Sequence, residues 1–79
     1  MPRFYFDLHK GDRVTRDEEG QEFVDVDAAE REAEKSVVQI YRDHDGQPHE
    51  MVTIDVRDEH GRIVAAVTAS LEVSRQRDS

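Results

Sequence analysis

The sequence predicts an α+β domain in which a β-hairpin, one helix and a second β-hairpin follow one another (ββαββ). We expect a four-stranded antiparallel sheet with the helix packed on one face. Two observations support this: apolar and polar residues alternate near both ends of the chain, and one segment between them repeats at the helical period. The 79 residues suffice for one domain, which we place at residues 1–73, with residues 74–79 as a frayed tail.

The first hairpin is predicted from residues 3–15. In the segment RFYFDLH the apolar side chains share one face of a strand, and Gly11 then allows a tight turn into the β-branched pair Val14 and Thr15. The next segment, RDEEGQEF at residues 16–23, predicts a turn or bulge at Gly20 that brings Phe23 to the core.

The helix is predicted over residues 26–43, where apolar residues fall on one arc of the helical wheel. Two caps fit its start equally well. Asp25 suits a helix that begins at Val26, whereas Asp27 forms a capping box with Glu30. Gly46 and the following proline end the helix.

The second hairpin is predicted from residues 51–73 around the turn EHG. By simple alternation, Ile63 shares a face with Ala65 and Val67, while Val64 and Ala66 lie on the other face. The sheet face away from the helix should then be mostly polar. Tyr5, Val64 and Ala66 would form an apolar patch on it that can seat a partner.

Composition excludes several functions. The net charge of −8, from 19 acidic and 11 basic residues, opposes direct binding to nucleic acid or to an anionic membrane and favours a basic protein partner. The absence of cysteine excludes disulfides, thiolate metal sites and a cysteine nucleophile. The first twelve residues carry no apolar run of the kind a signal peptide or membrane span needs, so we expect a cytoplasmic location.

The acidic stretch at residues 16–33 does not fit a calcium loop. Aligning Gly20 with the glycine of an EF-hand puts Thr15 and Val26 where acidic ligands are required. Asp17, Glu18 and Glu19 are therefore interpreted as solvated turn residues.

His44 and His49 are the candidate metal ligands, because acidic residues surround them. Their spacing in a loop sets no coordination geometry, so we expect no native metal and no cofactor. No nucleophile elbow or phosphate-binding glycine loop occurs in the chain, and we expect no catalytic residue and no enzymatic activity.

Four segments, MPRFYFDLHKGD, RDEEGQEF, DVDAAEREA and VRDEHGRIV, in this order resemble a family of small proteobacterial proteins known only as a domain of unknown function (DUF). The resemblance covers residues 1–71 and implies a cytoplasmic bacterial protein with the two-hairpin fold, but no catalytic residue, cofactor or substrate. The matching positions are Pro2, Arg3, Phe4, Tyr5, Phe6, Asp17, Gly20, Asp25, Ala29, Ala33, Asp58 and Gly61.

These observations favour a small non-enzymatic protein-interaction module that forms a homodimer and binds through a sheet face or edge. The alternative is an acidic inhibitor or regulator that mimics the charge of nucleic acid and binds a basic protein. The candidate partner-binding residues are Tyr5, Asp17, Glu18, Glu19, Glu22 and Val64.

Overall fold

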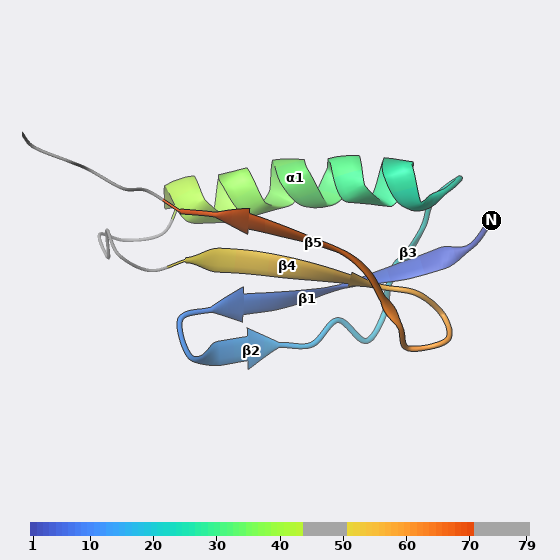
Figure 1. Cartoon of the computed structure of the whole chain (residues 1–79), viewed down its shortest axis with the longest axis horizontal. Helices are drawn as coiled ribbons and strands as arrows, with labels where there is room; N and C mark the ends of the chain where they lie inside the picture. Colours follow the sequence, from blue (N-terminus) through green and yellow to red (C-terminus); the bar gives the residue numbers. More distant parts are fainter. Residues whose placement is uncertain (44–50, 71–79) are drawn as a thin grey trace, which may run out of the picture.

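The computed structural model describes residues 1–43 and 51–70 and confirms the α+β fold (Figure 1). The predicted tail at residues 74–79, the predicted domain end at residue 73, and His44 and His49 all lie outside the described residues. The elements in chain order are β1 (Arg3–Lys10), β2 (Arg13–Thr15), β3 (Gln21–Glu22), α1 (Val26–Asp43), β4 (Val52–Arg57) and β5 (Ile63–Ala69).

The sheet has the order β2-β1-β4-β5, and every neighbouring pair is antiparallel. Each hairpin contributes two adjacent strands, and the two hairpins meet where Leu8 of β1 lies opposite Ile54 of β4. The short β3 also pairs with β1, with Arg3 opposite Glu22. The sequence predicted only a turn or bulge there, because two residues are too few to show an alternating pattern.

Asp25 caps the helix. Its Oδ1 accepts a hydrogen bond from the backbone N–H of Ala28 at 2.8 Å, and α1 begins at Val26 as predicted. Asp27 lies in the first turn of α1, where a carboxylate complements the positive end of the helix dipole. The helix start thus decides between the two caps that the sequence left open.

The core lies between α1 and the sheet (Figure 1). The helix packs on β4 and β5, and Ala29 and Ala33 are fully buried because their small side chains allow α1 to approach the strands closely. The described part of the chain contains no helix apolar and long enough to cross a membrane. The seven buried core residues are Phe4, Ala29, Ala33, Val37, Val52, Ile54 and Val56.

A β-bulge corrects the predicted faces of β5. The register shifts between Val56 and Arg57, so that Ile63 lies opposite Arg57 while Ala65 lies opposite Val56. One additional residue, Val64, is therefore accommodated in β5. The prediction that Ile63 shares a face with Ala65 was wrong: Ile63 lies on the face away from the helix. Val64 was also misplaced, because the extra residue breaks the alternation and Val64 lines a cavity on the helix side.

Candidate functional site

An ion pair between Asp7 and Arg57 lies on the sheet face away from the helix, which we call the open face. The guanidinium holds the carboxylate through two contacts, Nε to Oδ2 at 3.0 Å and Nη2 to Oδ1 at 3.3 Å. The side chain of Asp7 is only 13% exposed and that of Arg57 only 14%. The register puts Arg57 opposite Tyr5, so the pair crosses the strands diagonally. Its position therefore follows from strand order, which the sequence alone does not supply.

Asp17 joins this ion pair to the turn before β3. Its backbone N–H donates to Asp7 Oδ1 at 3.0 Å, and its carbonyl accepts from Arg57 Nη2 at 3.0 Å. Its carboxylate accepts from the backbone N–H groups of Phe6, Glu19 and Gly20 at 3.0 to 3.1 Å. The interpretation of Asp17 as a solvated turn residue was therefore wrong, because the turn folds it back onto β1.

Gly20 allows this turn to lie against β1. Its φ is +71°, and a Cβ at this position would stand 2.8 Å from a ring carbon of Tyr5 and 2.9 Å from the carbonyl oxygen of Phe4. No other residue fits without displacing these atoms. The Tyr5 ring lies between Gly20 and Arg57, whose Cζ is 4.7 Å from the ring centroid. Tyr5 is thus part of the internal packing of the open face and not of a patch with Val64.

The hydrogen bonds shift the pKa values of both carboxyls downward. The side-chain hydrogen bond from Arg57 lowers the pKa of Asp7 and outweighs the opposing effect of burial. Burial raises the pKa of Asp17, but the three backbone N–H donors together lower it below its ordinary value. Both groups are consequently held as carboxylates at neutral pH.

A second D-x-x-G turn connects β4 and β5 and resembles the first. Asp58 accepts hydrogen bonds from the backbone N–H groups of His60 at 2.8 Å and Arg62 at 2.9 Å. The N–H donor from Arg62 is the main cause that lowers the pKa of Asp58. Gly61 closes the turn with a φ of +82°. In both turns an aspartate side chain binds the backbone and a glycine takes the left-handed conformation.

A groove of about 300 Å³ runs over the open face beside the ion pair. On its floor His9 Nε2 contacts Asp55 Oδ2 at 2.8 Å, next to Asp7 and Arg57. Exposed side chains of Val14 and Ile63 line it as well. The residues around this groove include acids and bases but no hydroxyl nucleophile. The groove thus places two exposed apolar side chains beside the Asp7–Arg57 ion pair.

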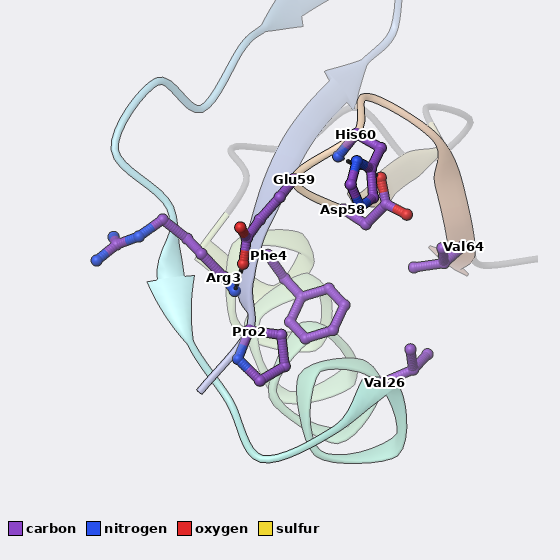
Figure 2. Close-up of a pocket in the computed structure, with 8 residues that line it drawn as sticks. All are labelled: Pro2, Arg3, Phe4, Val26, Asp58, Glu59, His60 and Val64. Carbon is purple, nitrogen blue, oxygen red and sulfur yellow. Dashed lines mark hydrogen bonds between the residues drawn. The ribbon is translucent and has the colours of Figure 1, made fainter.

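A second cavity, of about 290 Å³, lies at the end of the domain near the N-terminus (Figure 2). Figure 2 shows Phe4, Val26 and Val64 facing this space from β1, α1 and β5. Glu59 closes one side by accepting a hydrogen bond from the backbone N–H of Arg3 at 2.6 Å. The cavity is mostly apolar and suits a hydrophobic group better than a charged one.

The structure does not bring the predicted partner-binding residues together. Tyr5 and Asp17 are used within the open face, whereas Val64 lines the cavity of Figure 2. The carboxylate of Glu22 stands 3.9 Å from Arg3 Nη2, and Glu18 and Glu19 are exposed as predicted. Within residues 1–43 and 51–70, no three histidine or acidic side chains group as metal ligands would.

Sequence reasoning predicted that the sheet face away from the helix is mostly polar but did not recognise that Asp7 and Arg57 pair on it, as do His9 and Asp55. The available signal for these pairs is that charged residues alternate along both strands. This signal identifies the pairs only once β1 is known to lie beside β4.

Comparison with known protein families matches residues 3–70 to a domain of unknown function, DUF6894. The comparison with curated proteins and the comparison with solved structures returned no match. Of the positions on which the expected resemblance rested, the two aspartate–glycine turns, the helix cap and the two buried alanines all serve the fold. Because the match spans most of its length, the chain belongs to the DUF6894 family.

Proposed function

We propose that this domain is a non-enzymatic protein-interaction module that covers its open face with a partner chain. The observation that carries the proposal is the open-face groove, where Val14 and Ile63, each 62% exposed, flank the Asp7–Arg57 ion pair and the contact between His9 and Asp55. Covering the two apolar side chains is favourable, and the largely buried Asp7–Arg57 pair already satisfies its own charges.

The small core supports the same proposal. Among the described residues the buried core has seven members, two of them alanines, and a core of this size gives a chain of 79 residues only modest stability. Burial of additional apolar surface against another protein would add to that stability. A cytoplasmic location agrees with such a role and belongs to the same proposal.

The alternative, an acidic mimic of nucleic acid, has less support. It relied on a row of carboxylates from residue 17 to residue 30. Two carboxylates of that row form hydrogen bonds within the domain: Asp17 accepts from three backbone N–H groups, and Asp25 caps α1. The remaining exposed acids, Glu18 and Glu19 among them, favour a basic surface on the partner without requiring mimicry.

Affinity capture from the native host, read by quantitative mass spectrometry, tests the proposal. The wild-type domain is compared with Val14→Ser/Ile63→Ser and with the matched control Val24→Ser, whose side chain is 67% exposed but lies outside the groove. We expect wild type and the control to retain the same specific protein and the double variant to lose it. Equal retention by all three, or retention of nothing by wild type, would contradict the proposal.

A further inference from the structure

We infer that the domain pairs with a second copy of itself through the outer edge of β5, antiparallel and across a two-fold axis. The two β2-β1-β4-β5 ladders would then form one continuous sheet. This inference goes beyond the proposed function, because it assigns a second interaction surface. It concerns the edge of the sheet and leaves the groove of the open face free for other proteins.

The first argument is that β5 is an end strand of the sheet. Its inner edge pairs with β4, and in the part of the chain that the structure describes no strand pairs with its outer edge (Figure 1). The backbone N–H and C=O groups of such an edge readily accept another strand. The edge therefore offers a template of up to seven residues.

The second argument is the composition of β5. Its sequence, IVAAVTA, contains no charge and no proline, although 38% of the chain is charged. Natural sheets protect open edges with charges, prolines, short strands or bulges. The other edge follows this rule, because β2 has only three residues and includes Arg13. The bulge in β5 lies at its start, so Ala65 to Ala69 form a regular run without charge or proline.

The third argument concerns which partner fits this edge. Each copy carries a net charge of −8, so two copies repel unless they meet where the charge is lowest. Among the described helices and strands, β5 is the element that has no charged residue. A second copy therefore meets less electrostatic repulsion when it approaches β5 than when it approaches any other described helix or strand.

The strand also matches itself in shape. With the two-fold axis at Ala66, which lies in the regular part of β5, Ala65 faces Val67 of the second copy, so a small side chain meets a larger one on the helix side of the sheet. Ala65 and Val67 pack against the core but are only partly buried. Pairing at this register would cover them and extend the core across the axis.

Cysteine scanning tests the register directly, because the chain has no cysteine of its own. In Ala66→Cys the two thiols would meet at the axis, with Cα atoms about 4.5 to 5.5 Å apart. In Thr68→Cys the same atoms would be about 14 Å apart, because four residues separate them along the strand direction. Under mild oxidation we expect Ala66→Cys to form a covalent dimer at least about tenfold faster than Thr68→Cys and than the opposite-edge control Val14→Cys.

Ala66→Lys provides the complementary test, with Ala66→Ser as its control. Ala66 is exposed, so both variants should keep the circular dichroism spectrum of the wild type. Two lysines would face each other at the axis, and we expect Ala66→Lys to be monomeric while Ala66→Ser still dimerises.

Two results would overturn the inference: equal oxidation rates for the three cysteine variants, or a wild type that stays monomeric. The two proposals can fail separately. If the wild type is monomeric but captures a protein that the variant Val14→Ser/Ile63→Ser does not capture, the β5 dimer is refuted and the proposed function stands. The β5 edge could instead bind an extended segment of another protein. In that case the wild type would be monomeric and would capture a protein that Ala66→Lys fails to capture, and this result too would refute self-pairing.

Discussion

Replacing Asp17 with alanine removes the acceptor that holds the first D-x-x-G turn to β1. Its carboxylate binds the N–H groups of Phe6 and Gly20, which are partly buried, and that of Glu19, which is exposed. Water can replace the carboxylate at the exposed donor. A hydrogen bond to a charged group contributes roughly 1.5–3 kcal/mol when buried, and about 1–1.5 kcal/mol for each of the two partly buried donors is a reasonable share.

We therefore expect Asp17→Ala to lower the free energy of unfolding by about 2–3 kcal/mol. A chain of 79 residues has a total of roughly 4–12 kcal/mol, so the loss is large. It corresponds to a decrease in Tm of about 10–20 °C for a domain of this size. Asp17→Asn keeps a neutral acceptor and should lose about half as much.

Equilibrium urea unfolding followed by circular dichroism measures these changes. One protein concentration must be used throughout, because self-association would make the midpoint depend on concentration. The control is Glu18→Ala, whose exposed neighbouring side chain should change the free energy by less than about 0.5 kcal/mol. An Asp17→Ala variant as stable as this control would refute the role assigned to Asp17.

Three further predictions concern the fold. Gly20→Ala should cost roughly 2–4 kcal/mol, since it adds a clash with Tyr5 to the strain at positive φ, whereas Gly61→Ala meets no atom within 4 Å and should cost about 1 kcal/mol in the same urea experiment. Asp25→Ala should lower the free energy of unfolding by about 1 kcal/mol, while Asp27→Ala should stay within about 0.5 kcal/mol; equal losses would contradict the assignment of the cap. The folded pKa of Asp7 lies below its unfolded value of about 3.8, so the unfolded chain binds more protons in acid and stability should fall as the pH drops below about 4. Asp7→Asn should flatten this dependence, and an unchanged slope would count against the ion pair.

The sequence was sufficient where local patterns and tertiary structure agree. The bounds of α1 and of the first hairpin, and the presence of the second hairpin, follow from the periodicity of apolar residues, since a helix and a half-buried strand repeat at different intervals. The sequence left two candidates for the residue that caps the helix, Asp25 and Asp27. Only the residue at which α1 begins decides between them.

The features that failed depend on contacts between distant segments. The bulge exchanges the faces of Ile63 and Val64, and no local signal marks where one extra residue is accommodated. Asp17 looked like a solvated acid because its three donors become visible only when the turn lies on β1. The Asp7–Arg57 pair likewise needs the order of the strands.

The central proposal, that this domain acts through association with other chains and first with its own copy, is tested most directly by sedimentation equilibrium. The wild type and Ala66→Lys are measured from about 1 μM to about 1 mM, a range that covers weak and tight dimers. We predict that the mass of the wild type rises from the 9.1 kDa of one chain toward twice that value, while Ala66→Lys remains at 9.1 kDa. A wild type that stays at 9.1 kDa across the whole range would contradict the β5 dimer.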